Sequence, residues 1–254
     1  MKKGLGKSNR NISLYVVFIA VMFISFGCYG QTNGVLEGTD ITVNSDAGIY
    51  SKYIWRGFKL DSDPVMQPGI YVGIKELTIG IWGSMDIDAE DALNSDEIDY
   101  IIDYTHEFEK FSISVGHTYY DFPPGDTFSR EFYIGFGLNT ILSPTLTWYE
   151  DYGDEDSGGG NGSYVVLGLS HSFPLGDSPV NLDLSGHVGY NNELFITGEG
   201  GDTLLSAGLT VPLAGKITFN PNINYSIPFG DLKDSEDGNQ DEEFYYGFTL
   251  TFDF

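Results

Sequence analysis

Polar and ionisable side chains recur in this chain at every second position of stretches whose other positions are apolar. Residues two apart on a β-strand face the same side, so each such set shares one surface. The clearest case is Asn220, Asn222 and Asn224, which alternate with Pro221 and Ile223. The residues that we predict to line a shared interior in this way are Lys52, Arg56, Gln67, Asp99, Asp103, Glu107, Glu131, Asp183, His187, Asn220, Asn222 and Asn224.

An interior lined by these residues could conduct small solutes. Its excess of acid would favour cations through the field of the carboxylates. The alternative is a filled, nonconducting interior in which Lys52 and Arg56 pair with carboxylates as structural ties. Arg56 could also orient an anionic substrate, but a buried guanidinium needs a carboxylate partner, so we expect it to pair with an interior acid.

Three acidic clusters in polar segments point to a second chemistry, the binding of hard divalent cations by carboxylate oxygens. None has the spacing of an EF-hand loop. We therefore predict no resident metal and no cofactor, with divalent cations bound loosely at most; the other interpretation is a solvated acidic surface. The clusters are Asp86, Asp88, Glu90 and Asp91; Asp151, Asp154, Glu155 and Asp156; and Asp231, Asp234, Glu236, Asp237, Asp241, Glu242 and Glu243.

Catalysis is a third possibility, because some twelve-stranded barrels hydrolyse lipids with an outward Ser and His. Here no Ser-His-acid constellation emerges from the spacing. An acidic pair such as Asp99 and Asp103 could do acid–base work, but interior carboxylates more often set the local field. We predict no catalytic residue and no enzyme. Of the histidines, His187 falls on the polar face, and three fall on apolar faces: His106, His117 and His171.

The elements that must position these side chains are β-strands, because alternation with a period of two recurs along the chain. We predict about twelve strands, each long enough to cross a bilayer when tilted, which takes about 9–11 residues. Their expected spans are 46–57, 65–74, 77–86, 97–108, 110–121, 129–139, 144–152, 162–173, 178–190, 203–213, 215–227 and 242–254.

The connections between these strands alternate strictly between short and long. Short links fall at 75–76, 108–110, 140–143, 174–177 and 213–215. Longer polar loops fall near 58–64, 87–96, 122–128, 153–161, 191–202 and 228–241. This is the pattern of an outer-membrane barrel with short periplasmic turns and longer outer loops, and an even strand count places both ends in the periplasm.

The polarity of the two faces favours lipid over water outside the sheet. The polar face is rich in Gly, Ser, Thr and Asn rather than Lys and Glu, and the apolar face ends in aromatics, as in interfacial girdles. In lipid every backbone group must be bonded internally, so the sheet must close. We therefore predict an all-β, antiparallel transmembrane barrel in the bacterial outer membrane, surrounded by lipid.

The N-terminus resembles an export signal. A basic stretch ending at Arg10 precedes an apolar run over 12–26 and small residues at 27–30, so we predict a signal peptide over 1–30, a short lead over 31–45 and the barrel over 46–254. Lipidation of Cys28, the one cysteine, is the alternative, and a membrane anchor helix fits less well because the run is short.

The charge balance argues against nucleic acid as a partner. The whole chain has 12 Lys and Arg against 37 Asp and Glu, and four of the bases lie in the predicted signal. Few groups are therefore left to neutralise phosphates.

The last strand of the predicted barrel ends in aromatic residues. Phe252 and Phe254 share its apolar face, and Phe254 is the final residue. Outer-membrane proteins characteristically end this way, and the resemblance implies that these two side chains form an assembly signal read by the barrel assembly machinery.

Several motifs resemble those of a family of porins known as TorF-type, or bacterial Gcw-type, outer-membrane proteins. They comprise residues 51–57 (Ser-Lys-Tyr-Ile-Trp-Arg-Gly), 63–69 (Asp-Pro-Val-Met-Gln-Pro-Gly), 80–84 (Gly-Ile-Trp-Gly-Ser) and 116–120 (Gly-His-Thr-Tyr-Tyr). The resemblance covers 46 to about 137 and implies an outer-membrane barrel with a channel role.

The function predicted from these observations is a porin-like channel for passive diffusion of small solutes, biased toward cations. Two alternatives come from other classes. One is a nonconducting structural or adhesion barrel that acts through its acidic loops, and the other is a lipid-modifying enzyme.

Overall fold

A computed structural model of the chain describes residues 41–87, 97–123 and 125–254. Twelve antiparallel strands form one closed barrel. They are β1 (Ile41–Tyr50), β4 (Val65–Ile74), β5 (Leu77–Asp86), β6 (Glu97–Glu107), β7 (Phe111–Phe122), β8 (Thr127–Leu138), β9 (Thr145–Asp151), β10 (Ser163–Pro174), β11 (Asn181–Asn192), β12 (Glu199–Pro212), β13 (Ile217–Gly230) and β14 (Glu243–Asp253).

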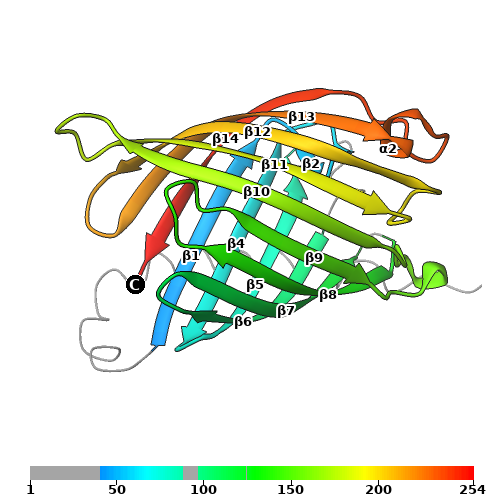
Figure 1. The fold of residues 1–254 in the computed structure, drawn as a ribbon, viewed down its shortest axis with the longest axis horizontal. Coiled ribbons are helices and arrows are strands. Elements are labelled where there is room, and N and C mark those ends of the chain that lie inside the picture. The colour runs from blue at the N-terminus through cyan, green and yellow to red at the C-terminus, as the bar shows by residue number, and fades with distance from the viewer. Residues whose placement is uncertain (1–40, 88–96, 124) are drawn as a thin grey trace, which may run out of the picture.

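Each strand of the barrel pairs with its neighbours in the chain, and β1 closes the circle by pairing with both β4 and β14. The strands run obliquely around the barrel (Figure 1). Both ends of the barrel chain meet at one rim, where the N–H of Phe254 donates to the carbonyl of Val43 at 3.0 Å. The prediction of an all-β, twelve-stranded, closed antiparallel barrel is confirmed.

The two rims differ in their connections. The turn end, where both chain ends lie, carries the short connections 75–76, 108–110, 139–144, 175–180 and 213–216. The opposite rim, the loop end, carries the longer connection between β1 and β4, the 3-10 turn Glu155–Ser157 and the one-turn helix α2 (Asp231–Asp234). In the part of the chain that the structure describes, no helix has the length and apolar character needed to cross a membrane.

Side chains alternate between the outside and the inside of the barrel, as the period-two pattern predicts. The middle of the outer face is aliphatic, with Ile79, Ile102, Ile134, Leu167 and Ile223 among its exposed residues. A water-soluble barrel would not leave such a continuous apolar surface uncovered. This face is therefore suited to lipid hydrocarbon.

Aromatic side chains edge this aliphatic belt at both rims. Outward tyrosines near the loop end include Tyr100, Tyr152, Tyr190, Tyr225 and Tyr246. Near the turn end a stacked row of phenylalanines runs through Phe108, Phe111 and Phe136, and Tyr104 donates to Glu76 at 2.7 Å. Two girdles that flank an apolar band are characteristic of transmembrane barrels.

Proline interrupts the hydrogen-bonded ladder at two places without breaking the barrel. Pro221 pairs with Phe248 of β14, but on its β12 side the residue pairing skips from Asn222 to Phe219. Pro68 similarly pairs with Ala47 of β1, while its pairing with β5 is interrupted. Proline has no N–H to donate, so each gap is confined to one side of its strand.

The first strand and the connection after it differ from the prediction. β1 begins earlier, at Ile41, and ends at Tyr50 rather than at 57. The residues that follow form a separate two-stranded hairpin, β2 (Tyr53–Trp55) and β3 (Phe58–Asp61), within the span expected to be strand end and polar loop. Residues 53–55 (Tyr-Ile-Trp) are β-forming residues like those of a wall strand, so local sequence alone does not mark the point where the chain leaves the barrel wall. The predicted signal peptide and Cys28 lie outside the described residues.

Candidate channel lumen

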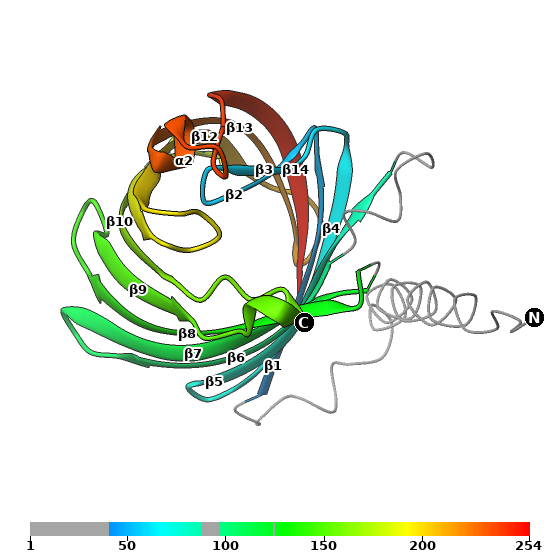
Figure 2. The same cartoon turned by 90° about the vertical axis from the view of Figure 1, so that its right-hand side faces the viewer.

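The β2–β3 hairpin lies inside the barrel rather than above it. End-on, it projects from the rim across the opening, beside β12–β14 (Figure 2). Its tip is the tight turn Arg56-Gly57, and both residues have positive φ, 48° and 82°. Such turns match the twist of a hairpin but favour glycine. A Cβ on Gly57 would also come within 2.7 Å of side-chain atoms of Asp202 and Leu232, so glycine lets the tip approach the wall.

The tip is held to the barrel by Arg56 and Glu131 of β8. The two guanidinium nitrogens Nη1 and Nη2 donate to the two carboxylate oxygens at 2.6 and 2.8 Å. This parallel pair is the strongest common geometry for an ion pair. The Glu131 side chain is 1% exposed and that of Arg56 is 10% exposed, so the pair is withdrawn from water.

Aromatic rings surround the same guanidinium. Its central carbon lies 4.5 Å from the ring centroid of Trp55, 4.2 Å from Tyr149 and 4.6 Å from Tyr164. Burial by itself would lower the pKa of Arg56, but the charge and hydrogen bonds of Glu131 outweigh it and raise that pKa above its ordinary value. Arg56 therefore stays charged and remains paired with the wall.

Two lysines fasten the base of the hairpin. Lys52 and Lys59 lie on either side of its tip, and both bond the carboxylate of Glu243 at the start of β14. The distance from Lys59 Nζ to Glu243 Oε1 is 2.5 Å. The hairpin is thus tied to β8 at its tip and to β14 at its base, across the width of the lumen.

Apolar contacts complete the packing of the hairpin. Phe58 forms a buried cluster with Ile196, from the connection between β11 and β12, and with Leu232 of α2. Trp55 packs against this cluster. Three segments far apart in the sequence therefore meet at the loop end and narrow the entrance to the barrel.

The hairpin contributes to the walls of two cavities. One, of about 360 Å³, is lined by Lys52, Tyr53 and Ile54 together with residues of β11–β14, β1 and β4. The other, of about 320 Å³, is lined by Trp55, Phe58 and Leu60 together with loop-end residues of β6–β9 and Phe195.

The lumen wall has an acidic side formed by β6–β9. Hydroxyl groups donate to most of its carboxylates: Tyr53 to Glu97 at 2.9 Å, Tyr120 to Glu131 at 3.0 Å, Tyr133 to Asp103 at 2.6 Å and Ser129 to Asp151 at 2.5 Å. One oxygen of the buried Asp99 has no hydrogen-bond partner among the described residues. The opposite side, formed by β12–β14, carries the three asparagines of β13.

The structure places most of the predicted interior residues on barrel strands. Lys52 and Arg56 instead belong to the hairpin segment, and both pair with carboxylates, as expected in the alternative in which they have a structural role. The others lie on strands and share the inward parity: Gln67, Asp99, Asp103, Glu107, Glu131, Asp183, His187, Asn220, Asn222 and Asn224. Whether they line a conducting pore stays a prediction.

Several residues of this lumen were not in the predicted set. Lys59 falls within an expected loop, Asp202 at the end of another, and Glu243 within the third acidic cluster. Asp202 accepts from Tyr164 at 2.7 Å and lies 3.0 Å from Nε2 of His187. Glu97 could have been found, because it has the same parity as Asp99.

The acidic clusters do not gather into cation sites where the structure describes them. Within 41–87, 97–123 and 125–254, no group of three or more His, Cys, Asp or Glu is arranged to hold a metal ion. In the third cluster, Asp237 accepts from Thr197 at 2.6 Å, Asp231 from the N–H of Glu199 at 2.8 Å, and Glu242 pairs with Lys233. Asp88, Glu90 and Asp91 lie outside the described residues.

The histidines lie on the predicted faces. His106 bonds Glu76, and His117 lies 2.6 Å from the Tyr152 hydroxyl, both on the outward side. His171 packs edge-on against Phe173. These four histidines contact the side chains of Glu76, Tyr152, Phe173 and Asp202. A Ser-His hydrolase would need a serine in such a position.

The sequence places the chain in a known family. The family model Gcw_chp, described as a bacterial protein of unknown function, matches residues 37–221, and the chain belongs to this family. The match extends well beyond the motifs at 46–137 and includes most of the second half of the barrel. No curated protein matches the sequence.

Solved structures share the barrel fold at low sequence identity. One, from the study "Unveiling the Mechanism Behind the in-meso Crystallization of Membrane Proteins", matches with a TM-score of 0.50 and 7% identity over 84% of each chain. The COG4313 outer membrane channel from Pseudomonas putida F1 matches with a TM-score of 0.46 and 10% identity, over 89% of this chain and 98% of that one. The translocator domain of the autotransporter NalP from Neisseria meningitidis has a TM-score of 0.41 and 14% identity, over 96% and 98%.

Proposed function

We propose that this protein is an outer-membrane channel of the TorF-type porin class, through which small solutes diffuse passively with a bias toward cations among ions. The observation that carries the proposal is the lumen itself. Its wall is polar, it contains a cavity of about 360 Å³, and its described carboxylates outnumber the three cations Lys52, Arg56 and Lys59.

The placement in the membrane follows from the outer face and the rims. The aliphatic belt between two aromatic girdles suits a bilayer. Short connections in such barrels face the periplasm, so the turn end would be periplasmic and the loop end would face the exterior. Insertion would depend on the barrel assembly machinery and on the terminal strand with Phe252 and Phe254.

The excess of acid supports a preference for cations. The three hairpin cations are each bound to a wall carboxylate, which leaves Asp99, Asp103, Asp183 and other acids to set the field of the lumen. A low-dielectric wall focuses such a field and raises the local concentration of counter-ions. The hairpin would then act as the constriction that limits solute size.

A nonconducting structural barrel is the second candidate, and one observation favours it. The apolar packing of Phe58, Ile196 and Leu232 draws three segments across the loop end. If this packing seals the entrance, the barrel would act through its exposed loops instead.

Single-channel recording separates the two. The refolded barrel, residues 31–254, is inserted into a planar bilayer under a KCl gradient. Discrete steps with a reversal potential on the cation side are expected for the channel. A barrel that is folded, as judged by heat-modifiable mobility in SDS gels, but electrically silent would overturn the channel proposal and favour the structural one.

A further inference from the structure

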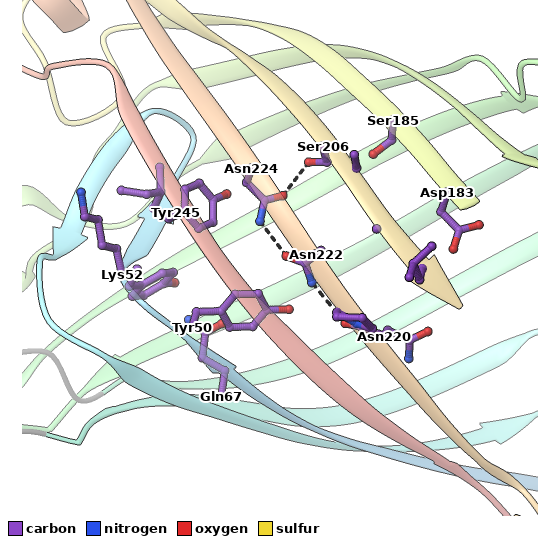
Figure 3. Close-up of a pocket in the computed structure, with 16 residues that line it drawn as sticks. Tyr50, Lys52, Gln67, Asp183, Ser185, Ser206, Asn220, Asn222, Asn224 and Tyr245 are labelled. Carbon is purple, nitrogen blue, oxygen red and sulfur yellow. Dashed lines mark hydrogen bonds between the residues drawn. The ribbon is translucent and has the colours of Figure 1, made fainter. Parts of the chain in front are cut away.

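The wall formed by β12–β14 differs chemically from the acidic side. Asn220, Asn222 and Asn224 project from successive inward positions of β13 into the 360 Å³ cavity (Figure 3). Ser206 of β12 and Tyr245 of β14 line the cavity on either side of them. Amides, hydroxyls and a phenol therefore form a largely uncharged surface.

The three asparagines form a hydrogen-bonded row along the strand. Asn224 Nδ2 donates to Asn222 Oδ1 at 2.7 Å, and Asn222 Nδ2 donates to the backbone carbonyl of Asn220 at 3.4 Å. Ser206 donates to Asn224 Oδ1 at 2.7 Å. The Asn220 amide donates instead to the Thr249 backbone carbonyl at 3.4 Å and to the Thr251 hydroxyl at 3.2 Å. All three side chains are therefore ordered before any solute arrives.

The row still has hydrogen-bonding capacity to offer a solute. A side-chain amide has two N–H donors and an oxygen with two lone pairs. The contacts of Asn222 and Asn224 along the row use one amide hydrogen of each, and Asn220 Oδ1 accepts none of the bonds in the row. A ligand lying along β13 would therefore meet donors and an acceptor in sequence.

Two charged residues line this cavity, Lys52 and Asp183. Lys52 is paired with Glu243. Asp183 accepts from Thr210 at 2.7 Å, which leaves further lone pairs for a hydroxyl. Tyr50 and Tyr245 add aromatic surface, and the Tyr50 hydroxyl is joined to Thr249 at 2.8 Å. An ion would find stronger electrostatic partners on the acidic side than here.

We propose that the amide row of β13 is a binding subsite for an uncharged, polyhydroxylated solute the size of a small sugar. Sugar hydroxyls both donate and accept, which matches amides, and the apolar faces of a sugar ring suit tyrosine rings. A volume of about 360 Å³ lies near the lower limit of small-molecule pockets, about 300 Å³. This inference rests on the proposed channel only for the route by which the sugar enters.

The first test measures binding without transport. Isothermal titration of the refolded barrel in detergent uses glucose and maltose as probes. The double variant Asn222→Ala/Asn224→Ala should bind at least about fivefold more weakly, because two hydrogen bonds to the sugar are lost. Asn44→Ala is the matched control, since Asn44 is an inward asparagine of β1 away from this cavity and should leave binding unchanged.

A second variant keeps the test decisive if the double alanine variant does not fold. Asn222→Leu keeps about the size of the side chain but removes both its N–H donors and its oxygen, and it should also weaken sugar binding. The subsite is overturned if wild-type protein binds neither sugar, or if Asn44→Ala loses as much affinity as the row variants.

Bilayer recordings in KCl with added maltose separate this inference from the channel proposal. Steps in KCl together with no sugar binding would leave the channel and remove the subsite. Sugar binding by an electrically silent barrel would leave the subsite and remove the channel. Steps that maltose interrupts in wild-type protein, but interrupts less in the row variants, would support both.

Discussion

Replacing Arg56 with alanine should release the tip of the β2–β3 hairpin from the lumen wall. The change removes two hydrogen bonds to Glu131, at 2.6 and 2.8 Å, and three contacts between the guanidinium and aromatic rings. It also leaves Glu131, whose side chain is 1% exposed, as a buried charge without its cation. The released tip would then be free to leave the lumen.

The size of the effect follows from the burial of the pair. Removing one partner of a buried ion pair costs about 3–5 kcal/mol. Each 1.4 kcal/mol is a factor of about ten in an equilibrium, so the ratio of docked to undocked hairpin should fall by about a hundredfold or more. Water that enters the opened lumen would solvate Glu131, which favours the lower end of this range.

Two assays report the change. Mean single-channel conductance should rise, because the constriction is displaced for a larger fraction of the time. Trypsin should cleave after Lys59 more readily, because this already exposed residue lies in a segment that can enter the protease only when the hairpin leaves the wall. In Arg56→Ala/Glu131→Ala the unpaired charge is gone, so part of the docked population should return.

Lys233→Ala is the control, because it breaks an ion pair with Glu242 in which both side chains are over 40% exposed. Such a pair contributes about 0–1 kcal/mol, so conductance and cleavage should stay at wild-type values. Conductance and trypsin resistance of Arg56→Ala equal to those of wild-type protein would refute the role of the pair.

Three further predictions follow from the same geometry. Gly57→Ala should weaken hairpin docking, because φ is 82° there and the new Cβ would meet Asp202 and Leu232 at 2.7 Å. The resulting strain of about 1–2 kcal/mol should raise the conductance while the barrel stays folded, and an unchanged conductance would contradict this. Lys52→Gln/Lys59→Gln should shift the KCl reversal potential further toward that of a cation-selective channel, because two positive charges are removed from the lumen. A shift toward anion selectivity would show that the acidic wall does not set selectivity. Deleting Phe254 should reduce insertion in cells while refolding into detergent proceeds normally, because the sheet loses only the hydrogen bond to Val43 whereas the terminal aromatic is lost entirely. Equal insertion, measured by heat-modifiable protein in membrane fractions, would argue against the assembly signal.

Much of the barrel could be predicted because each strand repeats the same local rule. A strand that separates lipid from a polar lumen must alternate, as Phe244, Tyr246 and Phe248 alternate with Tyr245 and Gly247 in β14. The predicted strands match the observed ones closely from 65 to 122, and connection length distinguishes the two rims. These features depend on residues close together in the chain, so they can be recognised in the sequence.

The hairpin could not be predicted in the same way. Residues 53–57 fall within a predicted wall strand and 58–61 within a predicted polar loop, and the turn signal at Arg56-Gly57 does not say whether a hairpin there folds outward or inward. That choice depends on partners distant in the chain, such as Ile196 and Leu232, which become neighbours only when the barrel closes.

The pairing of charges has the same origin. Pairing of Arg56 with an interior acid was expected from its chemistry, but which acid it meets depends on strand order and register. Glu131 lies four strands from β4 around the wall, and Glu243 meets Lys52 and Lys59 only because β14 lies beside β1.

By itself, the sequence determined that this chain forms a closed antiparallel barrel, which residues face inward, and which rim carries the turns, because alternation and loop length are local properties. Only the tertiary structure decided that the first connection folds into the lumen, that its three cations are held by Glu131 and Glu243, and that one wall is acidic while the opposite wall carries amides. These features arise from barrel closure, which sets side chains from distant strands against one another across a narrow lumen.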